Sequence, residues 1–224
     1  MNKLKLFYPR LQLVEKIAEQ HRFFHWELEV ADIFLERGGF DLIVGNHPWV
    51  RVEWMEGSIL GDYNPLVVLR SLSATKLAQE RDSAFEQYPG LRKAYLQEYE
   101  EAEGTQNFLS ALQNYLLLQG QKANLYKCFL TQGWKFVKSQ GVAGFLHPEG
   151  VYDDPNGGLL RSKLYQNLRA HFHFTNELTL FADVDHHTKF SINIYQNSFR
   201  LSDQIIRYIH IANLYTPKTV FECF

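Results

Sequence analysis

The chain has 224 residues, of which 46% are hydrophobic and 21% are charged, and its formal net charge at pH 7 is -2. These values are ordinary for a soluble globular protein of one or two domains with a sizeable core. No apolar run approaches the roughly 20 residues that span a bilayer, and the N-terminus lacks the apolar stretch of a signal peptide. We therefore expect a cytoplasmic protein whose two cysteines, Cys128 and Cys223, are buried thiols.

The charge pattern does not point to nucleic acid. A DNA-binding protein usually shows a basic face, and none is evident in this sequence. We therefore expect that the chain does not hold a DNA duplex unaided.

The first 45 residues combine helical and extended patterns. Apolar residues recur at helical spacing over residues 11–21 and predict an amphipathic helix: Leu11, Val14, Ile17 and Ala18. The aromatic stretch Phe23–Leu28 is predicted to be extended. After the break at Gly38–Gly39, the apolar run Phe40–Gly45 predicts a short buried strand of the kind found in parallel sheets.

Residues 53–120 differ in character from the rest of the chain. They are rich in Glu, Gln, Leu and Ala and weak in strand signals, so we expect a helical insertion. Tyr88-Pro89-Gly90 is predicted to interrupt it, and Glu98–Glu103 to form a solvated acidic face.

The remaining residues predict helices alternating with strands. A helix is expected over Ala123–Lys138, ended by Gln140–Gly141, and its inward-facing residues are expected to be Leu125, Phe129, Phe136 and Val137. A buried strand at Val142–Leu146, a helix over residues 159–170 and a strand at Phe190–Tyr195 follow. This alternation predicts an α/β sheet.

The most informative segment is Asn46-His47-Pro48-Trp49, directly after the strand predicted at Leu42–Val44. Ligands of open α/β sheets bind outside the carboxyl ends of strands. A polar side chain, a rigid proline and an aromatic ring at that point could form a corner that binds a nucleobase. Taken alone, the same four residues are also typical of a simple strand-ending turn.

The flanking sequence favours the first interpretation through a family resemblance. Asp41–Trp49 resembles the signature of amino-methylating DNA methyltransferases, in which Asn, Asp or Ser precedes Pro, Pro and an aromatic residue, and its lead-in is typical of adenine-specific members. Further blocks resemble, in order, segments of the large type IIG restriction-modification and phage-defence methyltransferases: Phe24–Leu28 with Asp32–Phe34, Asn124–Leu130, Gly141–Pro148, and Thr179–Phe181 through Thr188–Phe190. Most of the chain outside the insertion is covered.

The resemblance implies part of a Rossmann-like class I methyltransferase sheet, namely its later strands, with an inserted helical segment. The implied organisation is a partial catalytic domain made of residues 1–52 and 121–212, the insertion 53–120, and the start of a truncated C-terminal region at 213–224.

The resemblance also implies roles for single residues. The side-chain oxygen of Asn46 and the backbone carbonyl of His47 would accept the two hydrogens of adenine's exocyclic amine, followed by Pro48. The target base must leave the duplex, and Trp49 would offer it a stacking face. The remaining implied contacts are Phe181 and, behind it, Phe190 for the base, and Asp32 for the adenine of S-adenosylmethionine.

Two departures from the family pattern matter. His47 stands where the family has proline, so the ring that would fix the direction of that carbonyl is lost. The glycine-rich loop that cradles S-adenosylmethionine is missing, and neither Gly38–Gly39 nor Gly157–Gly158 lies in a suitable strand–loop–helix context. We therefore expect the chain alone to be inactive.

Other clusters are expected to have no catalytic role. The stretch Asp183–His187 could suggest a metal site, but a solvated loop is favoured and no metal is expected. Residues that we interpret as packing groups are His147, His171, His173, Trp26, Trp54 and Trp134. Glu149 lies near the expected site and receives no role. The acidic cluster of a nuclease is missing, so no DNA cleavage is expected.

The sequence therefore predicts the target-base part of an S-adenosylmethionine-dependent, adenine-specific DNA methyltransferase of restriction-modification or phage defence. The alternative is a non-catalytic fragment or subunit of a split or decayed gene that only binds a partner or flipped bases. The expected partners are DNA and either a donor-binding N-terminal half or subunit or a second copy of the chain, and no membrane. The DNA recognition sequence is not encoded in this segment.

Overall fold

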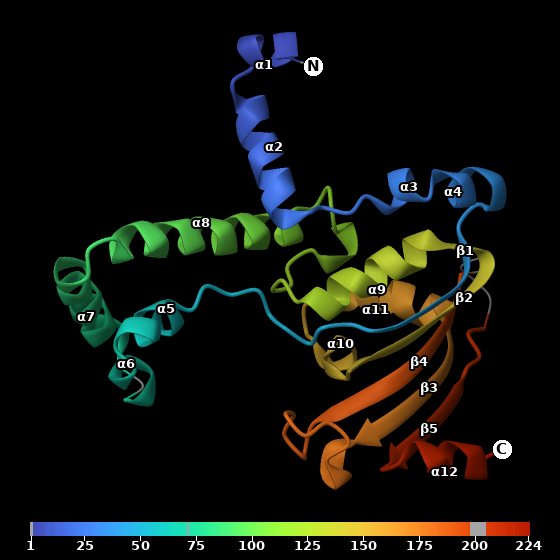
Figure 1. Cartoon of the computed structure of the whole chain (residues 1–224). Helices are drawn as coiled ribbons and strands as arrows, with labels where there is room; N and C mark the ends of the chain where they lie inside the picture. Colours follow the sequence, from blue (N-terminus) through green and yellow to red (C-terminus); the bar gives the residue numbers. More distant parts are fainter. Residues whose placement is uncertain (1, 71, 198–204) are drawn as a thin grey trace. The chain divides into compact units, whose positions relative to one another are not determined.

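The computed structural model describes residues 2–70, 72–197 and 205–224, and the chain divides into two compact units, Met1–Phe40 and Asp41–Phe224 (Figure 1). Among the described residues, no helix is long and apolar enough to cross a membrane. The three-part domain organisation expected from the sequence stays a prediction.

The N-terminal unit consists of four helices, α1 (Asn2–Phe7), α2 (Arg10–His21), α3 (Trp26–Glu29) and α4 (Ala31–Arg37). The helix predicted over residues 11–21 is confirmed. The extended segment predicted for Phe23–Leu28 is wrong from Trp26 onward, because the chain turns there into the short helix α3. The aromatic rings of this unit pack on one another: Phe24 on Trp26, and both Trp26 and Phe34 on Phe40.

The C-terminal unit contains a five-stranded mixed sheet in a mixed α/β fold, as the sequence predicts. The strand order is β1-β2-β4-β3-β5, with bounds β1 (Phe40–Asn46), β2 (Val137–Pro148), β3 (Leu168–Thr175), β4 (Lys189–Gln196) and β5 (Ile209–Leu214). Strand β4 is antiparallel to both β2 and β3, and β3 is parallel to β5. The remaining helices beside the sheet are α9 (Leu125–Phe136), α10 (Gly150–Asp153), α11 (Gly158–Asn167) and α12 (Pro217–Glu222).

The strands predicted at Val142–Leu146 and Phe190–Tyr195 are confirmed. Strands β3 and β5 were not expected: the helix predicted over residues 159–170 ends at Asn167, and the alternating residues that follow form β3. The helix predicted over Ala123–Lys138 ends at Phe136 rather than at Gln140, because Val137 is already extended and enters β2.

Helix α9 is rotated by about one residue from the expected phase. Its buried residues include Tyr126, Leu130 and Trp134, which recur every four positions and so share one face. Leu125 is partly buried against this core, whereas Phe129 was expected to face inward and is 43% exposed. Cys128 is buried as expected, but Cys223, also expected to be buried, is exposed near the C-terminus.

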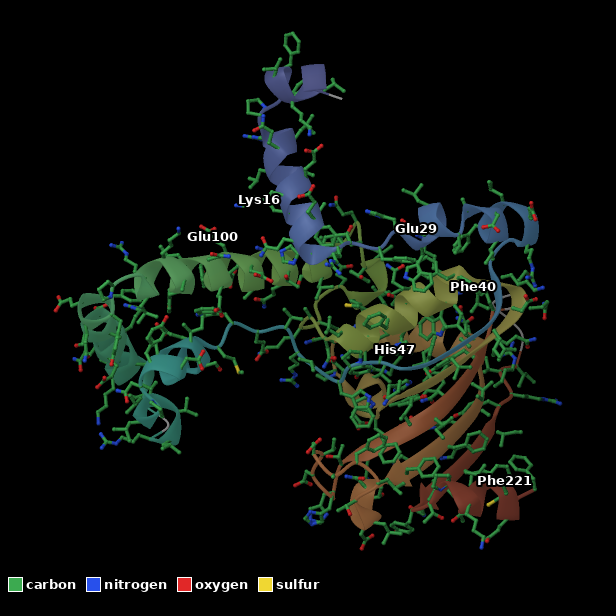
Figure 2. The ribbon with its side chains drawn as sticks, viewed as in Figure 1. Lys16, Glu29, Phe40, His47, Glu100 and Phe221 are labelled. Atoms are coloured by element: carbon green, nitrogen blue, oxygen red, sulfur yellow. The ribbon has the colours of Figure 1, made fainter. Side chains whose placement is uncertain are left out.

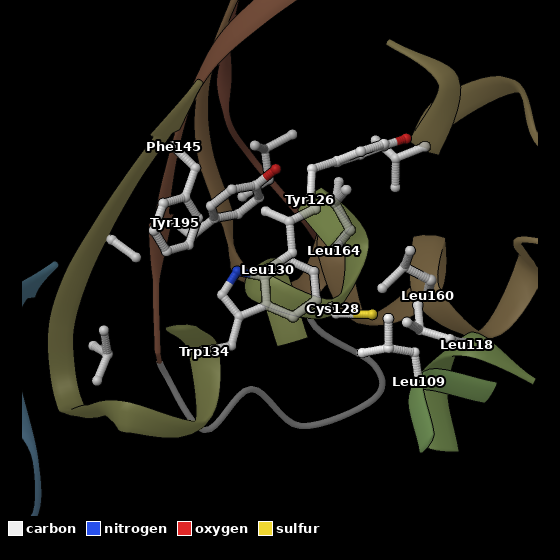
Figure 3. Packing of buried hydrophobic residues seen from close by; sticks show 14 of the residues in the cluster. Leu109, Leu118, Tyr126, Cys128, Leu130, Trp134, Phe145, Leu160, Leu164 and Tyr195 are labelled. Carbon is white, nitrogen blue, oxygen red and sulfur yellow. The ribbon is translucent and has the colours of Figure 1, made fainter. Parts of the chain in front are cut away.

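The two faces of the sheet have different neighbours. Alternation along the strands directs Phe145 and Tyr195 toward the core formed with α9 and α11, where they meet Leu130, Trp134 and Leu164 (Figure 3). A second, smaller cluster contains Phe174, Phe190 and Leu214. Because Phe190 pairs with Pro148 and Phe174, one register position away from the first core, this cluster lies on the opposite face.

Residues 53–120 are helical, as expected, with bounds α5 (Glu56–Tyr63), α6 (Leu66–Leu69), α7 (Ala74–Gln87), α8 (Leu91–Ser110) and the 3₁₀ helix η1 (Leu116–Leu118). The predicted break occurs at Tyr88-Pro89-Gly90, where Gly90 adopts a φ of 93° that favours glycine. A separate small core joins these helices: Ile59, Leu60, Val67 and Leu91.

Strand β1 forms an edge of the sheet within the part of the chain that the structure describes. It was expected to be buried, and that expectation is wrong: Leu42 is 61% exposed and Val44 is 74% exposed. The physical reason is that both side chains point to the same face of β1, and none of the described residues packs over them closely enough to bury them.

A network of polar side chains is buried between the sheet and its helices. His147, Ser191 and Asn193 are fully buried, and the amide nitrogen of Asn193 donates to Nε2 of His147 (2.9 Å). Because Nε2 accepts, Nδ1 carries the proton and donates to the carbonyl of Pro148 (2.9 Å). The Tyr152 hydroxyl completes the set by donating to Oδ1 of Asn193 (2.7 Å).

This network holds His147 in its neutral form. Burial lowers the pKa of His147 to about 4 from an ordinary value near 6.5. The unfolded chain therefore binds a proton at this residue between these two pH values while the folded chain does not. The stabilisation of the folded chain that depends on neutral His147 is fully present above pH 6.5 and is lost as the pH falls toward 4.

We predict that the free energy of unfolding falls between pH 7 and pH 4.5, with a contribution of up to about 3 kcal/mol from His147. Denaturant titrations at both pH values would measure it. In His147→Gln the fall should be smaller, because the titrating group is gone, whereas the control His186→Gln, at an exposed histidine, should keep the parent value. Equal falls in the parent and His147→Gln would contradict this account.

Candidate target-base site

The segment that follows β1 is fixed to the start of α9. Arg51 forms an isolated antiparallel bridge with Asn124, the amide of Leu125 donates to the carbonyl of Val50 (3.0 Å), and the amide of Val52 donates to the carbonyl of Ala123 (3.3 Å). These backbone bonds hold residues 47–50, which have no regular structure of their own, at the end of β1.

Two of the predicted site residues lie open to solvent. The side chains of Asn46, the last residue of β1, and of Pro48 are both exposed. The carboxamide of Asn46 is therefore accessible to a ligand at the end of the strand, the position at which ligands of α/β sheets bind.

Trp49, Phe181 and Phe190, which the family resemblance assigned to contacts with the base, lie together. The ring centroids of Trp49 and Phe181 are 5.2 Å apart, those of Trp49 and Phe190 are 5.9 Å apart, and Phe181 meets Phe190 edge-on at 5.1 Å. Phe190 is buried behind the other two and stacks on Phe174. Trp49 and Phe181 are half-buried, so part of each ring remains available for contact.

Asn176 holds Phe181 in this cluster, and the sequence analysis did not identify it. Its amide nitrogen donates to the carbonyls of Phe181 (2.9 Å), Val184 (2.9 Å) and Asp185 (3.4 Å), and its side-chain oxygen accepts from the amide of Phe181 (3.0 Å). The residue is fully buried. This one side chain adds to the backbone bonds inside the loop between β3 and β4, such as that from the amide of Val184 to the carbonyl of Phe181 (3.2 Å).

His47 is turned toward the neighbouring elements. Its ring stacks on Phe129 of α9, with centroids 4.8 Å apart and planes inclined by 13°, and it contacts Phe145 of β2 at 4.6 Å. Figure 2 labels His47 in the segment that follows β1. Burial lowers its pKa, so the ring is neutral at pH 7.

Asp32 lies in the first turn of α4 in the N-terminal unit, where its side chain is exposed. Glu149, which received no role from the sequence, accepts a hydrogen bond from Nε2 of His171 (3.0 Å), and this partner lowers its pKa against the opposing effect of burial. The Glu149–His171 pair lies on the sheet face that carries His147, whereas Phe190 lies on the other face.

The described residues contain no group of three or more His, Cys, Asp or Glu side chains that could hold a metal ion. In the loop Asp183–His187, Oδ1 of Asp185 accepts a bond from the amide of His187 (2.7 Å), which is a local turn.

Comparison with known proteins gives distant similarities of fold. No protein-family model matches the chain, and no curated protein matches it. A structure from Listeria monocytogenes, assigned as a class I S-adenosylmethionine-dependent methyltransferase, has 14% identity and a TM-score of 0.37, and covers 50% of this chain and 34% of its own. The DrdV–DNA complex has 12% identity and a TM-score of 0.43, with coverages of 84% and 16%.

A third similar structure is the ATP-dependent type ISP restriction-modification enzyme LlaBIII bound to DNA, with 12% identity, a TM-score of 0.36 and coverages of 81% and 11%. The chain therefore spans about a third or less of the length of these proteins. Similarity at this level concerns the fold, and the function proposed below rests on the residues of the site.

We predict that Asn176→Ala loosens the loop that carries Phe181. The substitution leaves buried backbone groups without partners, which typically costs about 1–3 kcal/mol for each group. Hydrogen exchange should become faster at residues 181–185, and the free energy of unfolding should fall. The matched control is Asn114→Ala, which removes a single exposed bond to the carbonyl of Phe108. Unchanged exchange at residues 181–185 would show that the loop is held by other contacts.

Proposed function

We propose that this chain supplies the target-base site of an S-adenosylmethionine-dependent DNA methyltransferase that modifies adenine-N6 in restriction-modification or phage defence. The observation that supports it most is the convergence of Trp49 and Phe181, from segments 132 positions apart. Trp49 follows, by three residues, Asn46, whose side chain is exposed at the end of β1. Aromatic faces next to a hydrogen-bond acceptor suit a flat base with an exocyclic amine.

In this proposal, Trp49 and Phe181 hold an adenine that has left the duplex. The base loses stacking with its neighbours when it is extruded, and the aromatic faces offset that loss. Phe190, which is buried, supports both rings from behind and does not need to touch the base.

Asn46 and His47 then act on the amine itself. The adenine amine is a weak nucleophile because its lone pair is shared with the ring. The side-chain oxygen of Asn46 and the carbonyl of His47 accept its two hydrogens and stabilise the positive charge that develops on nitrogen. Pro48 restricts the backbone between them and Trp49. After the methyl group is attached, the nitrogen loses one proton.

S-adenosylmethionine would supply the electrophilic methyl group, and the described residues do not form a site for it. Gly38–Gly39 joins helix α4 to β1 and Gly157–Gly158 joins α10 to α11, so neither follows a strand as a donor loop does. We therefore propose that a donor-binding half or subunit completes the site. In that assembly Asp32 is proposed to contact the adenine of the donor.

We predict that Asn46→Ala lowers methylation by about 10²–10³-fold in an assembly with a donor-binding half, because one acceptor of the amine hydrogens is lost. The control Asn46→Asp keeps an acceptor oxygen at the same place and should retain measurable methylation. Sequencing of N6-methyladenine in a host without its own adenine methylation would measure both. Full methylation by Asn46→Ala would refute the site, and DNA binding without methylation by the parent would favour a non-catalytic subunit.

We further predict that the chain is stable only with a partner that covers β1. Leu42 and Val44 present apolar side chains beside an unpaired strand edge, which promotes association. Co-expression with the N-terminal segment of a related enzyme should convert self-associated material into a defined heterodimer, measured by size exclusion with light scattering. Leu42→Lys with Val44→Lys should prevent this, whereas the control Leu69→Lys, at an exposed residue of α6, should not. A monomer with slow hydrogen exchange across Leu42–Val44 would contradict the prediction.

A further inference from the structure

The contacts of His47 explain how this chain can manage without the proline that the methyltransferase signature has at that position. The imidazole lies between two aromatic rings from different elements, Phe129 of α9 and Phe145 of β2. The contact with Phe129 is nearly parallel, with an angle of 13° between the planes, so it covers one face of the imidazole. The ring therefore links the segment after β1 to both neighbouring elements.

The imidazole is held by contacts of its ring faces with the two phenylalanines and not by hydrogen bonds of Nε2. Its Nε2 atom is buried and has no hydrogen-bond partner among the described residues, and burial lowers the pKa of the ring. On its strand side the ring lies over Gly45, where a Cβ atom would come within 2.8 Å of Cε1 of His47. A side chain at position 45 would require the ring to shift from this position.

Phe129 has one evident partner for its ring. It is 43% exposed and points away from the buried stripe of α9, and its described aromatic contact is the stack on His47. Here Phe129 clamps the residue whose carbonyl is the proposed second acceptor.

We propose that Phe129 is a positioning residue: by stacking on His47 it fixes the direction of the residue 47 carbonyl, as a proline ring would do covalently. The favourable free energy of an aromatic stack is of the same order as the cost of fixing one backbone residue, so the stack can take the place of a proline ring. This inference rests on the proposed function, because the carbonyl has a task only if it receives the amine of the target base.

The decisive experiment compares Phe129→Ala in two backgrounds. In the parent chain, Phe129→Ala should free residues 46–49, so their amide hydrogen exchange should become faster. In the His47→Pro background the proline ring restricts the backbone without help from α9, so adding Phe129→Ala should leave exchange at the remaining amides of this segment unchanged. Faster exchange in both backgrounds, or in neither, would overturn the proposal, because a merely structural role of Phe129 would not depend on residue 47.

Kinetics of the assembly with a donor-binding half provide the second readout. Phe129→Ala should lower kcat by about ten- to a hundredfold with little change in KM for DNA, since the base still binds but the amine is misaligned. His47→Pro combined with Phe129→Ala should restore kcat. A loss in KM alone, or no restoration, would contradict the positioning role.

Further variants separate stacking from other roles. Phe129→Tyr keeps the ring face that stacks on His47 and should keep the parent kcat, whereas a loss as large as that of Phe129→Ala would contradict a role through stacking. The matched control is Phe108→Ala, which truncates an exposed ring that packs on Tyr115 and should leave exchange at residues 46–49 unchanged. If the parent assembly methylates no adenine, the proposed function fails, while the exchange comparison still decides whether Phe129 fixes the segment.

Discussion

The structure depends on the antiparallel pairing of β4 with both of its neighbours. This central strand alternates in side-chain character, and the register with β2 and β3 fixes which residues meet on each face. Ser191, Asn193 and Tyr195 turn toward the helices, whereas Phe190 turns toward Trp49 and Phe181. A register shift of one residue in β4 would exchange the two sets. It would bury Phe190 under α9 and turn Ser191, Asn193 and Tyr195 to the opposite face.

The two faces of the sheet are stabilised by different kinds of contact. On the helix-covered face, the buried side chains of His147 and Asn193 are joined by a hydrogen bond. Both must be placed accurately, because a buried polar group without a partner costs folding free energy. On the other face, Trp49, Phe181 and Phe190 are held by ring contacts that tolerate small shifts. A rigid polar layer behind an adaptable aromatic surface would suit the proposed function, in which a base is inserted and released.

The sequence predicted those features that depend on the pattern of neighbouring residues along the chain. The alternation of Phe190–Tyr195 and the apolar run at Val142–Leu146 predicted two strands, and helical spacing predicted α2. Family resemblance, rather than any local pattern, suggested Trp49 and Phe181 as contacts of the base, and these two roles stay predictions. Strand β3 was hidden because its first residues continue the pattern of the helix before it.

Other features depend on contacts between distant residues and left no local signal. Asn176 holds its loop through four bonds that exist only once the loop has closed. The outward position of Phe129 follows from the phase of α9, which is set by Tyr126 and Leu130 packing on the sheet rather than by spacing within the helix. The exposure of Leu42 and Val44 follows from the absence of a covering element within the described chain, which periodicity does not report.

The close approach of His47 to Gly45 limits the order in which substitutions can accumulate at the two positions. While the imidazole lies over the glycine, any side chain at position 45 must displace a ring that is held between Phe129 and Phe145. A change at position 47 has no such obstacle, and once the imidazole is gone this clash at position 45 is gone with it. The effects of substitutions at the two positions are therefore coupled, so a side chain at position 45 is tolerated better after a change at residue 47 than before it.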